Sequence, residues 1–173
     1  MTSLRRFVLA GASGALLVLS FPKFGNGVVG LFALAPLFMA LRGASPWHGF
    51  LLGYVSGVVS SLGLVYWTSL VVTQFGGMPL PVGIAVMVLL CLTLGLFPAL
   101  VGVSVARLGR DIGPAALFSA PVFWVATELV RVHTFWQFPW CLLGYTLSET
   151  PALVQLAAYG GVHLVSLFVA TVS

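Results

Sequence analysis

Six apolar runs, separated by charged residues and by Pro/Gly clusters, divide the chain. A helix that crosses a bilayer needs about 20 consecutive apolar residues, with a range of about 17–25. The runs therefore predict an all-α integral membrane protein, a polytopic bundle of about six transmembrane helices of which two are short. The predicted helices cover residues 7–21, 28–41, about 47–72, about 81–106, about 114–131 and 152–173.

The composition excludes a soluble domain and a nucleic-acid-binding protein. Hydrophobic residues make up 60% of the 173 residues and charged residues only 6%, and the mean hydropathy is +1.14. Soluble domains carry about 25% charged residues, so this chain cannot cover a surface that faces water. The net charge of +4 comes from seven Lys/Arg and three Asp/Glu, which is too sparse for the clustered basic face that nucleic acids require.

The distribution of Lys and Arg predicts how the helices are oriented. Cytoplasmic loops carry an excess of these residues, and a cytoplasmic N-terminus places five of them inside and two outside. The loop 132–150 then faces outward, which in a bacterial protein is the periplasmic side. Bulky residues in "LSFPKFG" stand where a signal peptidase needs small ones, so the first helix is predicted to be retained. The inner residues are Arg5, Arg6, Arg42, Arg107 and Arg110, and the outer ones are Lys23 and Arg131.

Small residues recur every four positions along the third predicted helix, at Gly49, Gly53, Gly57 and Ser61. They form one stripe of the helix surface. Such a stripe either lets another helix pack closely or forms a shallow groove for an acyl chain, and the sequence leaves both interpretations open. Pro98 and Pro121 lie inside the fourth and fifth predicted helices and are expected to kink them.

One carboxylate lies inside an apolar helix. Ionisable groups are costly within a membrane and mark functional sites there more often than elsewhere. Glu128 is followed three residues later by Arg131, so that both side chains lie on one helix face. The pair is interpreted either as a structural ion pair near the outer boundary or as part of a functional site.

Aromatic residues crowd the stretch that follows, "RVHTFWQFPWCLLGY" (131–145). Trp and Tyr gather at membrane interfaces in general, which is the simplest interpretation. However, a rigid loop with Pro139 at its centre is also suited to gripping lipid chains or docking a partner domain. The rings are those of Phe135, Trp136, Phe138, Trp140 and Tyr145.

The sequence predicts no catalytic residue, metal site or cofactor. Cys91 and Cys141 make no disulfide framework, and a reactive thiol needs a base or a cation to lower its pKa. His133 lies eight residues from Cys141, and nothing in the sequence brings the two together. The three histidines, His48, His133 and His163, share no metal-ligand spacing.

The stretch "ELVRVHTFWQFPWCLLGY" resembles the segment of apolipoprotein N-acyltransferases that reads E-x-x-R, F-P-W and L-G-Y. Weaker matches precede and follow it in family order: "LSFPKFG", "ALAPLFMALR", "GFLLGYVSGVVSSLGLVYWTSLVVTQFGGMPLP", "LGLFPAL" and "VQLAAYGGVHLVS". In the last of these, His163-Leu164 replaces a Tyr-Gly pair of the family. The matched residues in the main segment are Glu128, Arg131, Phe138, Pro139, Trp140, Gly144 and Tyr145.

The resemblance implies a membrane-bound transferase of the bacterial inner membrane. The family moves an acyl chain from a phospholipid to the N-terminal cysteine of a diacylglyceryl lipoprotein, through a thioester on an enzyme cysteine. Its Glu-Lys-Cys triad belongs to a periplasmic nitrilase-like domain that follows the membrane helices. Residues 1–173 are therefore expected to be the N-terminal transmembrane domain, truncated before the catalytic domain and inactive alone. Cys141 matches no triad motif.

The resemblance also suggests where lipid binds. Phe75, Phe138, Trp140 and Tyr145 are expected to line a lipid cleft, with Glu128 and Arg131 bracing the helix that presents the rings. The expected partners are the phospholipid donor, the lipoprotein acceptor and a nitrilase-like domain in the same or an adjacent chain. Two alternatives are a non-catalytic membrane module that binds lipid or a partner, and a small transporter.

Overall fold

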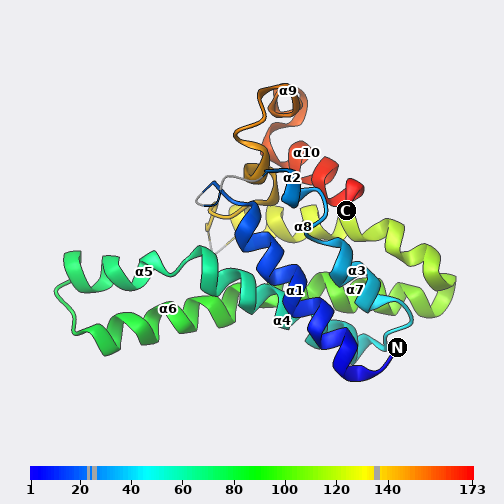
Figure 1. Cartoon of the computed structure of the whole chain (residues 1–173), viewed down its shortest axis with the longest axis horizontal. Helices are drawn as coiled ribbons and strands as arrows, with labels where there is room; N and C mark the ends of the chain where they lie inside the picture. Colours follow the sequence, from blue (N-terminus) through cyan, green and yellow to red (C-terminus); the bar gives the residue numbers. More distant parts are fainter. Residues whose placement is uncertain (23, 25–26, 135–136) are drawn as a thin grey trace.

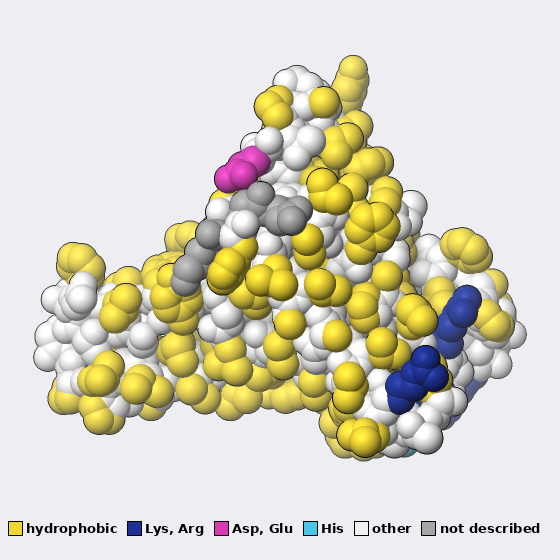
Figure 2. All heavy atoms as spheres, in the orientation of Figure 1, with side chains coloured by type: hydrophobic (Ala, Val, Ile, Leu, Met, Phe, Trp, Pro, Cys, Tyr) yellow, Lys and Arg dark blue, Asp and Glu magenta, His cyan; other side chains and the backbone are white. Residues whose placement is uncertain are grey.

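The computed structural model describes the chain except residues 23, 25–26 and 135–136. Its described part is almost wholly helical and contains no β-strand (Figure 1). Many large apolar side chains are exposed, and Figure 2 shows them covering the visible face. The predicted fold class, an all-α membrane bundle, is confirmed.

Four long helices and one short helix build the body of the bundle. α4 lies between α1 and α7, and α8 runs back beside α7 (Figure 1). The core consists mainly of Leu, Val and Ala side chains from these helices. The five elements are α1 (Ser3–Ser20), α3 (Ala35–Leu41), α4 (Pro46–Leu64), α7 (Leu96–Ile112) and α8 (Ala120–His133).

The stripe of small residues on α4 packs against α7. A Cβ added at Gly53 would overlap the carbonyl oxygen of Pro98, and one at Gly49 would overlap that of Gly102. At Gly57 an added Cβ would lie 2.9 Å from the Cα of Gly95. The structure therefore supports the close-packing interpretation, because α7 covers the stripe that an acyl chain would need.

The third predicted helix is bent rather than straight. α4 ends at Leu64, and a bend of 49° separates it from α5 (Trp67–Leu70) and the π-helix η1 (Val71–Phe75). α5 and η1 pair with the start of α6 (Leu80–Leu94) and project from the body (Figure 1). We refer to residues 67–90 as the arm.

The fourth predicted helix is two helices in line. Gly95 joins α6 to α7 with helical dihedral angles, φ −58° and ψ −23°. The 15 residues of α6 and the 17 of α7 thus make about 50 Å of nearly continuous helix, at roughly 1.5 Å per residue.

The fifth and sixth predicted helices are shorter than expected. A 3-10 helix, η2 (Gly113–Ser119), precedes α8 and moves Pro121 into the first turn of α8. The expected kink at Pro121 is wrong, because proline fits the first turn of a helix without loss of a hydrogen bond. The last stretch consists of α9 (Pro151–Val154) and α10 (Ala157–Val172), and α10 is broken at Gly160 and Gly161. The remaining short elements are α2 (Gly27–Gly30) and the 3-10 helix η3 (Leu143–Leu147).

Two helical stretches of the described chain are long and apolar enough to cross a membrane, Ser3–Ser20 and Leu80–His133. The bent pair formed by Pro46–Leu64 and Trp67–Phe75 adds a third if it is counted as one span. Gly113, with φ +63°, turns the chain within the second stretch. The membrane character of the chain is therefore confirmed, whereas the number of about six crossings stays a prediction.

Candidate functional site

The candidate site is the aromatic loop, residues 134–145, which follows the C-terminal end of α8. The backbone of Gln137 and of Cys141 has positive φ, 41° and 59°. Non-glycine residues adopt this region rarely and are held there by their surroundings. Residues 137–145 of the loop therefore have a definite shape that contacts from the bundle must impose. The expected rings Phe135 and Trp136 lie outside the described residues.

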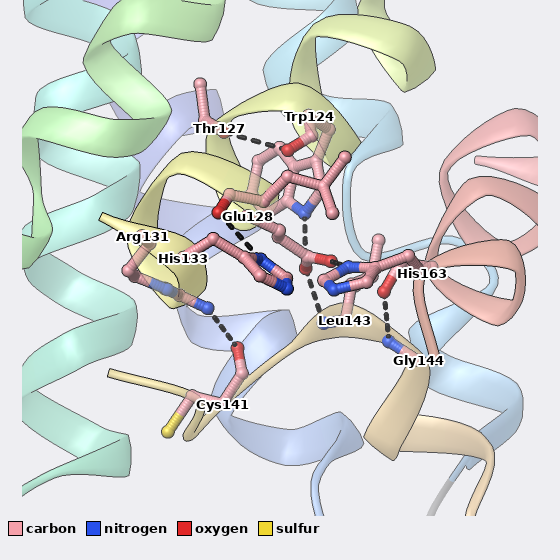
Figure 3. Close-up of polar contacts among 11 residues, drawn as sticks. Trp124, Thr127, Glu128, Arg131, His133, Cys141, Leu143, Gly144 and His163 are labelled. Atoms are coloured by element: carbon pink, nitrogen blue, oxygen red, sulfur yellow. Dashed lines mark hydrogen bonds and ion pairs between the residues drawn. The ribbon is translucent and has the colours of Figure 1, made fainter. Parts of the chain in front are cut away.

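Glu128 supplies the central contacts (Figure 3). Its side chain is only 4% exposed. Oε1 accepts a hydrogen bond of 3.1 Å from Nε1 of Trp124 and one of 2.7 Å from the backbone N–H of Leu143. Oε2 lies 3.6 Å from Nδ1 of His163 on α10. One carboxylate thus contacts its own helix, the loop and α10.

Arg131 binds the same loop from the next turn of α8. Its Nη2 donates to the carbonyl oxygen of Cys141 at 3.3 Å, and its guanidinium carbon lies 5.9 Å from the centre of the Phe97 ring. No ion pair joins Arg131 to Glu128 in the described structure, where Oε2 of Glu128 faces His163. Each of the two side chains instead binds the loop backbone separately, and a role of the pair in bracing the rings stays a prediction.

Gly144 completes the attachment of the loop to α10. Its N–H donates to Oγ of the fully buried Ser166 at 2.8 Å. A Cβ at Gly144 would lie 2.6 Å from the carbonyl oxygen of Val162. Only glycine therefore fits at this position without moving α10, which explains why glycine lies between Leu143 and Tyr145.

The structure brings some of the predicted rings together. Phe138 and Trp140 have ring centroids 5.2 Å apart, and Trp67 from the arm meets Trp140 edge-on at 6.4 Å. Trp140 is 52% exposed and Tyr145 is 40% exposed. Phe75, at the end of η1, is 83% exposed and lies eight residues along the arm from Trp67.

A small cavity lies beneath the loop, between α1, α4, α7 and α8. Ser60, Ser61, Arg131 and Cys141 contribute polar atoms to its wall. It offers about 40 Å³ to water, and one water needs roughly 10–15 Å³ by this measure. The cavity thus has room for a few waters but not for an acyl chain.

The surroundings of Cys141 and His48 set their chemistry. Burial raises the pKa of the Cys141 thiol to about 11, although the nearby Arg131 guanidinium lowers it, so the thiol stays protonated at neutral pH. Nδ1 of His48 forms a hydrogen bond of 2.8 Å with Oγ of Ser45 at the start of α4. Within the described chain, no group of three or more His, Cys, Asp or Glu side chains is arranged to hold a metal ion.

Sequence analysis missed four residues of this site. Trp124 lies one turn before Glu128, so the helical spacing of four was an available signal. Trp67, His163 and Ser166 come from elements distant in sequence. No local pattern predicts that these three meet the loop.

The fold and site define a class, an all-α membrane protein in which Glu128 and Arg131 of one helix hold an aromatic loop. Residues 13–173 match the family described as "Apolipoprotein N-acyltransferase N-terminal domain", and the chain belongs to this family. The predicted resemblance is confirmed.

Similar proteins include three named apolipoprotein N-acyltransferases. The one from Geobacter metallireducens is 39% identical over 166 residues, covering 96% of this chain and 32% of that protein. The one from Vibrio vulnificus is 31% identical, covering 95% and 32%. The one from Methylococcus capsulatus is 34% identical, covering 85% and 29%. The chain thus spans about a third of the length of these relatives.

Proposed function

We propose that this chain is the membrane domain of an apolipoprotein N-acyltransferase, which transfers an acyl chain from a phospholipid to the N-terminal cysteine of a diacylglyceryl lipoprotein. The observation that carries the proposal is the family match over residues 13–173. The chemistry is assigned to a Glu-Lys-Cys set in a nitrilase-like domain, in the same or an adjacent chain. The protonated thiol of Cys141 supports this division, because a thiol with a pKa of about 11 is a poor nucleophile at neutral pH.

The aromatic loop is the proposed lipid contact of this domain. Phe138, Trp140 and Trp67 form one cluster of rings, and about half of the Trp140 side chain is free to contact a ligand. Tyr145 and Phe75 are proposed to extend this wall. Since the cavity below is too small for an acyl chain, the donor lipid is placed along the outer faces of the rings.

The proposed topology has the N-terminus in the cytoplasm and the aromatic loop in the periplasm, in the inner membrane. Nη2 of Arg6 donates to the carbonyl oxygen of Arg42 at 2.9 Å, and Arg42 and Arg110 line one pocket. These contacts bring the three cations close together, and Figure 2 shows Lys or Arg side chains gathered at one end of the bundle. α8 leads from that end to the aromatic loop. This arrangement supports the proposal that the cations and the loop lie on opposite sides of the membrane. The predicted outer residue Lys23 lies outside the described residues.

The experiment has two arms. In the first, bacteria depleted of their own N-acyltransferase express the complete reading frame, together with an adjacent reading frame for a nitrilase-like domain where that domain is separate, and the lipoprotein N-terminus is analysed by mass spectrometry. Restored N-acylation is expected, and unacylated lipoprotein at normal expression would overturn the proposed activity. A non-catalytic membrane module or a small transporter predicts this negative result.

The second arm locates the lipid. The protein is reconstituted with a phospholipid that carries a photoreactive group on one acyl chain, and crosslinked peptides are identified. Enrichment at residues 137–145 and at Trp67 is expected. Crosslinks spread evenly over the exposed apolar helices, such as Leu4 and Val122, which are 76% and 61% exposed, would refute a specific lipid contact.

A further inference from the structure

The carboxylate of Glu128 joins three elements that are separate in the sequence. It accepts from Trp124 on α8, accepts from the N–H of Leu143 in η3 and faces His163 on α10 (Figure 3). The neighbouring Gly144 donates to Ser166, three residues after His163 and on the same side of α10. Two consecutive loop residues are thus bound from two different helices.

The facing atoms of Glu128 and His163 constrain where a proton lies. Oε2 and Nδ1 are 3.6 Å apart, and neither has another hydrogen-bond partner. A carboxylate oxygen presents only lone pairs, and so does an unprotonated imidazole nitrogen. Two sets of lone pairs repel each other in a buried, weakly polar environment. A proton between these atoms removes the repulsion and turns the contact into an attraction.

The hydrogen bonds of Glu128 favour His163 as the donor. Oε1 already accepts from Nε1 of Trp124 and from the N–H of Leu143, so the carboxyl group serves as an acceptor at this site. A proton on Nδ1 of His163 lets Oε2 accept in the same way. The other titratable group near His163 is His133, whose ring centroid is 6.1 Å away and whose Nδ1 lies 3.2 Å from the carbonyl oxygen of Leu129.

We propose that Glu128 and His163 are positioning residues that lock the aromatic loop between α8 and α10, with His163 donating from Nδ1 to Oε2 of Glu128. The lock acts immediately after the break in α10, since Gly161, with φ +63°, precedes His163 by two residues. It fixes Leu143 directly, between Trp140 and Tyr145. The consequence for lipid, that these rings are held in place, rests on the proposed function; the lock itself does not.

The first test reads the proton directly. The full chain is labelled with ¹⁵N-histidine and studied by NMR in detergent micelles, and the signals of His163 are assigned by their loss in His163→Leu. Only three histidines contribute signals. A protonated Nδ1 on His163 supports the lock, and an unprotonated Nδ1 overturns it. The proton is read in the unaltered chain, and His163→Asn and His133→Leu provide the assignment if His163→Leu folds poorly.

The second test reads the position of the loop. In a Cys91→Ser background, the rate of labelling of Cys141 by a thiol reagent reports how well the loop is packed. His163→Leu is expected to accelerate labelling about tenfold or more. His163→Asn should stay near the parent rate, because its amide N–H lies close to the position of Nδ1. His133→Leu is the matched control and should change nothing.

The outcomes separate the lock from the proposed function. Equal rates for His163→Leu and the parent, or for His163→Leu and His163→Asn, would overturn the lock. Neither test contains a donor lipid, so such a failure would leave the proposed acyl transfer standing. Conversely, lipid crosslinking could fail while Nδ1 of His163 is protonated and the loop is packed. That result would overturn the proposed lipid contact and leave the lock standing.

Discussion

Trp140→Ala is the sharpest test of the lipid wall. A tryptophan side chain offers roughly 150–250 Å² of contact area, and 52% of Trp140 is exposed. A bound acyl chain can therefore cover about 100 Å² of the ring. At roughly 25 cal/mol per Å² this contact contributes about 2.5 kcal/mol as an upper value, which corresponds to a loss of at most about 60-fold in affinity for the lipid.

The assay is thioester formation from a phospholipid donor by the complete protein, at matched expression and matched thermal stability. Trp47→Ala is the control, since this ring is 64% exposed and stacks on Phe50 at the start of α4. A membrane belt predicts small and equal losses at both positions. That result, in folded proteins, would refute the reasoning.

Trp67→Ala removes the edge-on partner of Trp140 without removing Trp140 itself. An aromatic pair contributes about 0.5–1.5 kcal/mol beyond its buried area, so a loss of about two- to tenfold is expected. A loss larger than that of Trp140→Ala would place the main lipid contact on the arm.

Three further predictions concern topology, packing and pH. Ser148→Cys, with Cys141→Ser, should react with a membrane-impermeant thiol reagent in intact spheroplasts; labelling only after lysis would contradict a periplasmic loop. Gly53→Ala should lower the free energy of unfolding by about 1–3 kcal/mol, because its Cβ overlaps the carbonyl oxygen of Pro98, whereas Gly11→Ala meets nothing within 4 Å and should be neutral or stabilising in a denaturation series. Labelling of Cys141 should still rise about tenfold per pH unit up to pH 10, because only the thiolate reacts and burial raises its pKa to about 11; a plateau near pH 9, as expected for an exposed cysteine at position 148, would contradict that burial.

The sequence predicts the membrane character and the first helix well, because both depend on long apolar runs. It predicts the later helices less well. The bend after Leu64 and the break at Gly160 and Gly161 lie inside apolar runs, where hydropathy does not change. Pro121 is predicted inside a helix for the same reason. Hydropathy does not change between the 3-10 helix η2 and the start of α8, so the sequence does not show where α8 begins.

The residues of the site also divide into those with a local sequence signal and those without one. Glu128 stands out because a carboxylate in an apolar helix is rare, and that signal is local. Its partners are not local: Leu143 is 15 residues away, and His163 lies on α10. Arg131 was expected to pair with Glu128 from helical spacing alone. In the fold, a backbone carbonyl of the loop lies closer to its Nη2 and binds it instead.

The length of the helix made by α6 and α7 has a consequence for how the arm meets the bilayer. Membrane helices tilt by up to about 40° from the bilayer normal. A helix of about 50 Å tilted by 40° still rises about 38 Å, whereas the hydrocarbon core is about 30 Å thick. Tilting therefore cannot bury this helix completely. About 8 Å of it must reach the headgroup layer or beyond, which is the length of about one and a half turns. The last turns of α7 carry Arg107, Arg110 and Asp111, so this charged end is suited to lie among the headgroups while the apolar arm at the other end stays within the lipid tails.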